Sequence, residues 1–114
     1  MKEKLALFCD VDADAVIQNM TASTIYEVPL MMQKEGLDKI VLEKLEMDYR
    51  PAHMEEWERM VHRIKNPANK VKIAVVGKYV ELPDAYISVT EALHHAGIYN
   101  STDVKIKWVN AERN

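Results

Sequence analysis

The stretch 71–97 constrains the fold most strongly, because it has the pattern of one β-strand followed by one crossover helix. Six mostly apolar residues, 71–76, precede a loop, and an amphipathic segment that starts at Pro83 closes at Gly97. A second strand-like run covers 104–109. Such β-α-β units build parallel sheets, and several units are needed to cover both faces of a sheet. The sequence therefore predicts an α/β protein that looks like a piece of something larger.

Residue spacing also predicts which faces of this unit are apolar. The helix is expected to present one face made of Tyr86, Val89, Leu93 and Ala96. Gly97 is expected to stop that helix at its C-terminus. On the last strand, alternation places Ile106 and Trp108 on one face and two lysines on the other. Gly77, at the end of the first strand, is expected to allow close backbone packing.

The N-terminal half begins with a continuous apolar run. Residues 5–11 are interrupted only by Asp10, which is the pattern of a strand covered on both faces. Cys9 lies inside this run and is therefore expected to be a small buried residue. Because Cys9 is the only cysteine, the chain cannot form an intrachain disulfide.

Three helical segments follow this run. Thr24 and Glu27 have the spacing of a capping box. Pro29 is expected to disfavour helical conformation at the preceding Val28 and to begin a helix itself as a first-turn residue. Gly36 fits the left-handed position after the end of that helix. A second helix is expected from Leu37 to about Met47. The third is indicated by apolar residues at intervals of three and four, namely Met54, Trp57, Val61 and Ile64.

Charge and hydropathy exclude several classes of partner. The 114 residues include 18 acidic and 15 basic side chains, and a net charge of −3 offers no footprint for nucleic acid or an anionic membrane. No apolar run approaches the roughly 20 residues that a membrane helix requires. The N-terminal residues 1–4 lead into the first apolar run without a cleavage-site pattern. A cytoplasmic location is therefore expected.

Several chemical motifs are incomplete. Asp10 and Asp12 resemble the paired carboxylates of haloacid dehalogenase phosphatases, but that family also needs adjacent aspartates at a later strand end. The alternative is a solvated acidic loop at a strand end. A calcium-binding loop of the EF-hand type is excluded. Its sixth position should be glycine and is Ala15, and its twelfth should be glutamate and is Thr21. The sequence thus contains no complete catalytic or metal-binding set.

The strand end at Gly77 is a weaker candidate site. Lys78 follows this glycine as in a phosphate-binding loop, but the next residue is Tyr79 and no glycine precedes at the required spacing. Ligands of open α/β sheets bind beyond the carboxyl ends of strands, so Lys78 and Tyr79 remain possible ligand contacts. His94 and His95 are adjacent on a helix and cannot both face one metal ion.

A succession of blocks along the chain resembles CTP synthase. The blocks are Leu5-Ala6-Leu7-Phe8-Cys9-Asp10-Val11, Thr24-Ile25-Tyr26-Glu27-Val28-Pro29-Leu30, Gly36-Leu37-Asp38, and Val75-Val76-Gly77-Lys78-Tyr79-Val80-Glu81-Leu82-Pro83-Asp84-Ala85-Tyr86. They follow in order over nearly the whole chain, and the order makes the resemblance specific.

The resemblance implies a ligase with two parts: an ATP-dependent amidoligase that aminates UTP, and a class I glutaminase that supplies ammonia. It assigns residues 1–52 to the tail of the synthetase domain, 53–70 to an interdomain linker helix, and 71–114 to the first β-α-β of the glutaminase domain. The expected fold is thus incomplete pieces of two parallel-sheet domains joined by a helical linker. The catalytic residues of both parts are expected to lie outside this chain, which alone should be inactive.

The resemblance also implies ligand contacts. Lys4 matches a lysine that helps to hold the pyrimidine nucleotide, UTP or the inhibitor CTP. Met20, Thr21 and Ala22 match the segment lining the adenine of ATP. In many members the corresponding three residues are a charged residue, Asp and Val, so this chain differs at all three. Lys78 and Tyr79 lie where the activator GTP approaches.

For the parent enzyme, the resemblance implies ATP and Mg²⁺ as cofactors and UTP, CTP, glutamine and GTP as ligands. It also implies a homo-oligomer, a tetramer in the family, with no nucleic acid or membrane partner. A stand-alone α/β module that binds or scaffolds without catalysis is the alternative.

Overall fold

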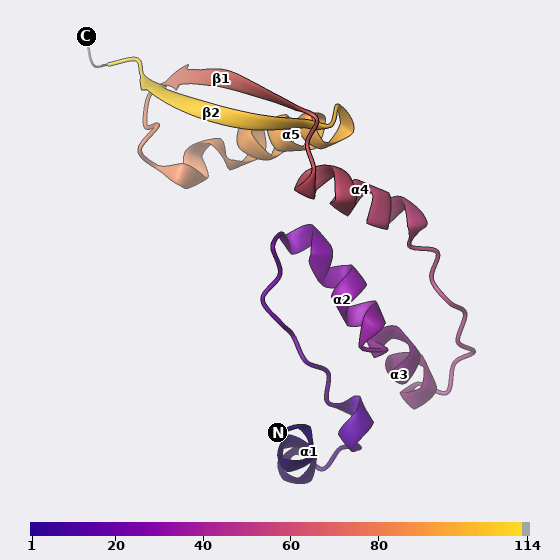
Figure 1. Ribbon diagram of the computed structural model, residues 1–114. Coiled ribbons are helices and arrows are strands. Elements are labelled where there is room, and N and C mark those ends of the chain that lie inside the picture. Colours follow the sequence, from indigo (N-terminus) through magenta and orange to yellow (C-terminus); the bar gives the residue numbers. More distant parts are fainter. Residues whose placement is uncertain (113–114) are drawn as a thin grey trace. The chain divides into compact units, whose positions relative to one another are not determined.

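The chain divides into two compact units, Met1–Glu58 and Arg59–Asn114. The computed structural model describes residues 1–112, with Pro83 described by its backbone alone. The last two residues of the predicted segment 71–114 lie outside the described residues. Helices and one parallel pair of strands make up the described chain (Figure 1), which confirms the predicted α/β class.

Among its described residues, the first unit contains helices and turns but no strand. It contains α1 (Lys2–Cys9), α2 (Val28–Lys34) and α3 (Leu37–Lys44), with short 3₁₀ turns η1 (Ala13–Ala15) and η2 (Ile25–Glu27). Helix α4 (Glu55–Lys65) starts in this unit and continues into the second.

Helix α1 replaces the strand predicted over residues 5–11, and that prediction was wrong. A strand covered on both faces needs neighbouring strands to pair its backbone groups, and the described part of this unit contains none. A helix pairs those groups within itself, and Lys, Glu, Leu and Ala are good helix formers. The helix ends at Asp10 in a left-handed conformation, with φ 52°. Ala6 is its buried residue, whereas Cys9 is exposed, so the predicted burial of Cys9 was also wrong.

The start of α2 departs from the predicted capping box by one residue. The Thr24 hydroxyl accepts a hydrogen bond from the Tyr26 N–H at 3.4 Å, as a cap should. The Glu27 carboxylate, however, reaches back to Ser23 and accepts from its N–H at 3.2 Å and its hydroxyl at 2.9 Å. Pro29 lies in the first turn of α2 as predicted, but Val28 before it already has helical dihedrals. The expectation that proline excludes Val28 from the helix was therefore wrong.

Helices α2 and α3 are separated by Gly36, whose φ of 80° confirms the predicted left-handed position. A side chain at this φ would be strained. Helix α3 ends at Lys44, three residues before the predicted Met47, because Glu46 adopts a φ of 54°.

Helix α4 confirms the third predicted helix and its apolar stripe. Val61 is buried, and Met54, Trp57 and Ile64 are partly buried. The Trp57 indole N–H donates to the Tyr26 carbonyl at 2.7 Å, and the two aromatic rings lie 6.4 Å apart. These contacts attach the first turn of α4 to η2.

The second unit is built on two parallel strands, β1 (Asn69–Gly77) and β2 (Thr102–Asn110). They pair in register from Asn69 opposite Thr102 to Gly77 opposite Asn110. Between them the chain forms the 3₁₀ turn η3 (Pro83–Tyr86) and helix α5 (Ile87–Tyr99). Figure 1 shows α5 lying along one face of the strand pair. This arrangement confirms the predicted β-α-β unit.

The packed face of α5 is rotated from the predicted one. Val89 and Ala96 are exposed, whereas Thr90 and Leu93 are partly buried and Gly97 is buried. Gly97 does not stop the helix, which continues to Tyr99, so that prediction was wrong. The glycine serves close approach instead, since an added Cβ would lie 2.6 Å from the Thr102 carbonyl oxygen and 2.8 Å from Val104 Cγ2.

Candidate functional site

The carboxyl end of the strand pair is the candidate site of the second unit. Gly77 ends β1, and its carbonyl accepts from the Ala111 N–H at 2.9 Å, which extends the pairing beyond β2. Tyr79 follows with a φ of 56°, and its carbonyl accepts from the Leu82 N–H at 2.9 Å in a tight turn. The backbone therefore bends sharply where ligands of open α/β sheets bind.

Tyr86 fixes the shape of this turn. Its hydroxyl donates to the Lys78 carbonyl at 2.6 Å, and its ring lies 5.7 Å from that of Trp108. The same hydroxyl occupies the space that a Cβ on Gly77 would need. The predicted role of Gly77 in close packing is confirmed, although the partner is a side chain from η3.

Lys78 and Tyr79 are both brought to this edge and exposed to solvent. The Lys78 ammonium pairs with Glu112 at 2.8 Å, and both side chains are more than half exposed. An exposed pair of this kind contributes little stability and is exchangeable, because water screens it. The Lys78 cation can therefore change partners to an anionic ligand.

The first unit contains the other predicted contacts. Lys4 lies on α1 and is exposed. Met20 and Thr21 are exposed on the segment between η1 and η2, and Ala22 is partly buried there. All four residues are thus accessible in whole or in part, on two separate segments.

Glu35 connects those two segments, and sequence reasoning missed it. Its Oε2 accepts from the Lys2 ammonium at 2.8 Å and from the Gln18 N–H at 3.5 Å. Lys2 and Gln18 lie two residues before Lys4 and Met20 respectively. The hydrogen bond from Lys2, aided by that from Gln18, holds the pKa of Glu35 below its ordinary value. One carboxylate thus holds the start of α1 beside the segment that leads to Met20.

The aspartates of the phosphatase-like string do not form a reactive pair. Asp10 is the left-handed residue after α1, and Asp12 pairs with the Lys44 ammonium. The Lys44 hydrogen bond lowers the pKa of Asp12, so the carboxylate stays ionised and paired. No strand precedes these residues, because residues 2–9 are helical. The expected strand-end geometry is absent.

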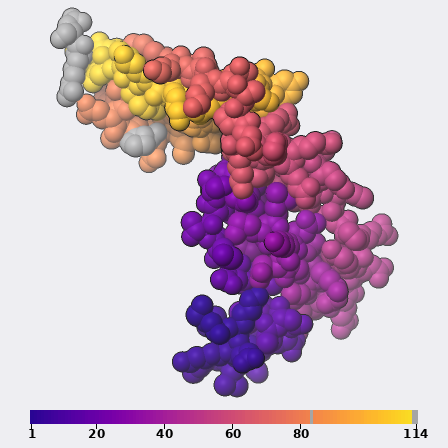
Figure 2. Space-filling view, viewed as in Figure 1, coloured from indigo at the N-terminus to yellow at the C-terminus, as the bar shows by residue number. Residues whose placement is uncertain are grey.

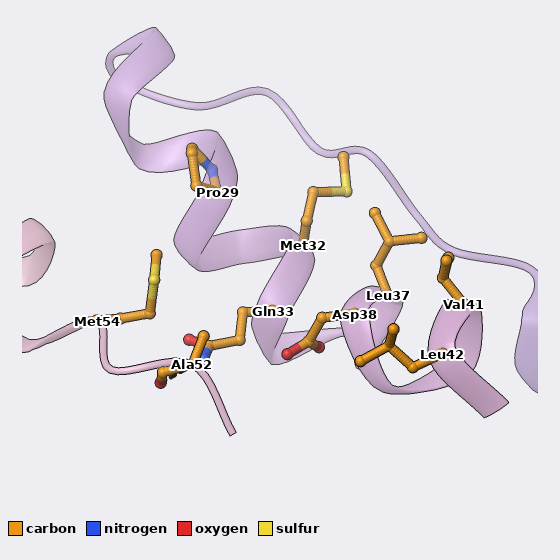
Figure 3. Close-up of a pocket in the computed structure, with 9 residues that line it drawn as sticks. All are labelled: Pro29, Met32, Gln33, Leu37, Asp38, Val41, Leu42, Ala52 and Met54. Carbon is orange, nitrogen blue, oxygen red and sulfur yellow. Dashed lines mark hydrogen bonds between the residues drawn. The ribbon is translucent and has the colours of Figure 1, made fainter. Parts of the chain in front are cut away.

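A hollow of about 460 Å³ lies beside α2 and α3 in the first unit (Figure 3). We call it the α2–α3 hollow; its lining is Pro29, Met32, Gln33, Leu37, Asp38, Val41, Leu42, Ala52 and Met54. The Gln33 side-chain amide donates to the Ala52 carbonyl at 3.3 Å, which holds the segment before α4 at one wall.

Asp38 is the one charged residue of this lining, and its two oxygens differ. Oδ2 accepts from the Tyr49 hydroxyl at 3.3 Å. Oδ1 is buried and has no hydrogen-bond partner among the described residues. Burial and the neighbouring Asp38 carboxylate raise the pKa of Tyr49, which keeps the phenol protonated as a donor.

The described residues contain no group of three His, Cys, Asp or Glu side chains that could hold a metal ion. Among the same residues, no helix is both long and apolar enough to cross a membrane. The described residues can contact ligands through exposed cationic side chains and through backbone N–H and C=O groups.

Comparisons with known proteins point to one family. The model of the CTP synthase N-terminus matches residues 1–47. CTP synthase of Desulfitobacterium hafniense is 60% identical over 112 residues, which cover 98% of this chain and 21% of that enzyme. CTP synthase of Moorella thermoacetica is 58% identical over 96% of the chain and 20% of its own length. That of Methanocaldococcus jannaschii is 57% identical over 99% of the chain and 21% of its own length.

The chain thus spans about a fifth of the length of the curated relatives it matches. Identity above one half along nearly all of its residues leaves no long segment outside the match. Along nearly its whole length, the chain is similar to CTP synthases, of which it covers about one fifth.

Proposed function

We propose that this chain serves as a segment of a CTP synthase, a ligase that makes CTP by ATP-dependent amination of UTP with ammonia released from glutamine. The observation that carries the proposal is 55–60% identity to CTP synthases over at least 96% of the chain. Such an enzyme acts in pyrimidine nucleotide biosynthesis in the cytoplasm and assembles as a homo-oligomer, as the family resemblance implies.

In this proposal the segment joins the two activities of the enzyme. Residues 1–52 close the synthetase domain, 53–70 form the linker, and 71–114 open the glutaminase domain. The helical character of 55–65 and the parallel pairing of β1 with β2 support these roles. A parallel pair needs further strands and helices to cover it, and the rest of the glutaminase domain would supply them.

The synthetase part contributes to nucleotide binding. Lys4 donates to UTP or CTP as a charged group, and the backbone of Met20, Thr21 and Ala22 contacts the adenine of ATP. Backbone donors and acceptors do this irrespective of the three side chains, which differ from those of many members. The Glu35 carboxylate supports this role, because it ties both segments together.

The glutaminase part contributes to activation. Lys78 and Tyr79 lie at the carboxyl edge of the sheet and meet GTP, with Lys78 exchanging Glu112 for a phosphate. The family resemblance gives Mg²⁺ no ligand in this segment. Mg²⁺ and both catalytic centres belong to other segments of the enzyme, so the chain alone makes no CTP.

A chimera tests the proposal. The corresponding segment of the Desulfitobacterium hafniense enzyme is replaced by residues 1–112 of this chain, and CTP formation is followed with UTP, ATP and glutamine. We expect activity within about tenfold of the unmodified enzyme, because the two segments are 60% identical over 112 residues. A folded chimera of native oligomeric state that makes no CTP would contradict the proposal.

Lys4→Ala in the active chimera tests the nucleotide contact. Loss of a charge-assisted hydrogen bond, worth about 1.5–3 kcal/mol, should raise the KM for UTP about ten- to a hundredfold and weaken CTP inhibition in parallel. Glutamine hydrolysis should keep its intrinsic rate. Lys39→Ala, an exposed lysine on α3, is the matched control. An unchanged UTP dependence would remove Lys4 from the site.

A further inference from the structure

Three consecutive backbone carbonyls at the end of β1, those of residues 77–79, each accept a hydrogen bond from a different part of the second unit. The donors are Ala111 after β2, Tyr86 in η3 and Leu82 in the turn between them. Ala111 and Leu82 donate through backbone N–H groups, which every residue except proline offers. The third donor is the Tyr86 hydroxyl, at 2.6 Å, so this bond depends on the identity of one side chain.

Tyr86 is itself held by its surroundings. Its carbonyl accepts from the Thr90 hydroxyl on α5 at 3.3 Å, and its ring lies 5.7 Å from that of Trp108 on β2. Figure 2 shows yellow atoms from the end of β2 next to orange atoms of the segment between β1 and α5. The hydroxyl fits beside Gly77 because that residue has no Cβ. It therefore reaches the Lys78 carbonyl from a side chain with little freedom to turn away.

The Tyr86 bond fixes the residue that carries the cation of the site. The carbonyl and the side chain of Lys78 leave the same Cα, so holding the carbonyl restricts the direction in which the ammonium can point. Tyr79, the next residue, has a φ of 56°, which is uncommon for residues other than glycine. Without the hydroxyl, the turn can relax from this conformation, and the Lys78 side chain would change direction with it.

We propose that Tyr86 is a positioning residue for activation by GTP. This inference rests on the proposed function, in which Lys78 exchanges Glu112 for a phosphate of GTP. Tyr86 acts through Lys78, by keeping the turn in the conformation that binds the anion. When only a fraction of the molecules has the binding conformation, the apparent affinity falls by that fraction. Loss of the hydroxyl should therefore raise the GTP concentration that is needed, without lowering the response at saturation.

Tyr86→Phe in the active chimera tests this role, because it removes the hydroxyl and keeps the ring beside Trp108. The GTP concentration for half-maximal CTP formation from glutamine should rise about three- to tenfold. The rate at saturating GTP should stay unchanged, and so should the rate with free ammonia, which bypasses the glutaminase part. Tyr99→Phe, an 81% exposed tyrosine at the end of α5, is the matched control. An unchanged half-activating concentration, or equal losses of both rates, would overturn the proposal.

Gly77→Ala provides a second variant that leaves Tyr86 in place. The new Cβ would collide with the Tyr86 hydroxyl and displace it from the Lys78 carbonyl. In folded enzyme of native oligomeric state, this variant should also raise the half-activating GTP concentration about three- to tenfold. Added to Tyr86→Phe, it should raise that concentration less than about twofold further, since the hydroxyl is already gone. A folded Gly77→Ala enzyme with an unchanged GTP requirement would refute the role of the hydroxyl.

A double-mutant cycle with Lys78→Met separates this inference from the proposed function. If Tyr86 acts through Lys78, the double variant should need no more GTP than Lys78→Met alone. Multiplying effects in folded enzymes would show that Tyr86 acts by another route and would overturn the proposal. A raised GTP requirement for Lys78→Met but not for Tyr86→Phe refutes the positioning role alone. If Lys78→Met has no effect, the proposed GTP contact is wrong and this inference is wrong with it.

Discussion

At the scale of single residues, Gly77 and Tyr86 fix the candidate site of the second unit. The tyrosine hydroxyl fills the space next to the glycine and donates to the Lys78 carbonyl. The tyrosine ring also lies against Trp108 and cannot swing away without losing that contact. The position of Lys78 therefore depends on Gly77. This glycine has a negative φ, so it is needed only because a Cβ there would collide with the Tyr86 hydroxyl.

Gly77→Ala should destabilise the second unit by about 1–3 kcal/mol, because the new methyl group forces the Tyr86 hydroxyl aside. Tyr86→Phe alone should cost about 0.5–1.5 kcal/mol through the lost hydrogen bond. The double variant should cost less than the sum, since phenylalanine makes room for the methyl. Urea unfolding of the four chains measures this, and strict additivity would contradict the described geometry.

Glu35 gives a residue-scale prediction about pH. Its pKa in the folded chain lies below the ordinary 4.5, chiefly through Lys2, so its contribution to stability is complete above that value and is lost as the pH falls through the folded-state pKa. Lys2→Met should return the Glu35 pKa toward 4.5 and flatten this acid dependence. NMR titration of the Glu35 carboxyl carbon measures it, with Lys39→Met as control. A Glu35 pKa that Lys2→Met leaves in place would exclude the pair.

At the scale of elements, patterns with local causes could be predicted and patterns that depend on neighbours could not. The apolar stripe of α4, the left-handed Gly36 and the β-α-β order follow from spacing and backbone sterics within a few residues. The run 5–11 is different, because an apolar run fits a buried strand or a helix equally and only its surroundings decide. Here no strand of the first unit pairs with it among the described residues, and it is helical.

The candidate sites also contain residues whose roles could be predicted from local sequence and residues whose roles could not. Lys78 and Tyr79 could be placed at a strand end from sequence, because that end follows from the apolar run before it. The roles of Glu35 and Asp38 could not be predicted, since their partners Lys2 and Tyr49 lie 33 and 11 residues away in the chain. Long-range pairs of single side chains leave no periodic pattern in a sequence.

Gly97 gives a prediction for α5. Replacing glycine by alanine inside an exposed helix stabilises it by roughly 1 kcal/mol. Here Gly97→Ala should instead destabilise the second unit by about 1–3 kcal/mol, because the Cβ meets the Thr102 carbonyl and Val104. Ser88→Ala, at an exposed position of the same helix, is the control and should be neutral or slightly stabilising. Chemical denaturation followed by circular dichroism distinguishes the two signs.

At the scale of the whole molecule, little apolar surface is removed from water. The buried apolar residues of the described chain are Ala6, Val61 and Val104. The accessible surface is 9262 Å², whereas two separate compact proteins of half the mass would together expose roughly 7,700 Å². Each unit therefore retains apolar surface that a stable domain would bury.

We expect the isolated chain to unfold below about 65 °C in a broad transition whose midpoint rises with protein concentration, because association buries surface that a single copy cannot. Circular dichroism at several concentrations measures the midpoint. A sharp, concentration-independent transition of a monomer above that temperature would contradict this expectation.

The pairing of β1 with β2 has one more consequence. In the described chain each strand pairs on one side only, so two rows of backbone N–H and C=O groups lie open along the outer edges. Both strands carry exposed lysines, which are Lys70 and Lys72 on β1 and Lys105 and Lys107 on β2. Repulsion between like charges discourages the same lysine-bearing strand of a second copy from adding to either edge. This protection against cross-β growth is electrostatic, so it weakens as salt rises or as the lysines are acetylated.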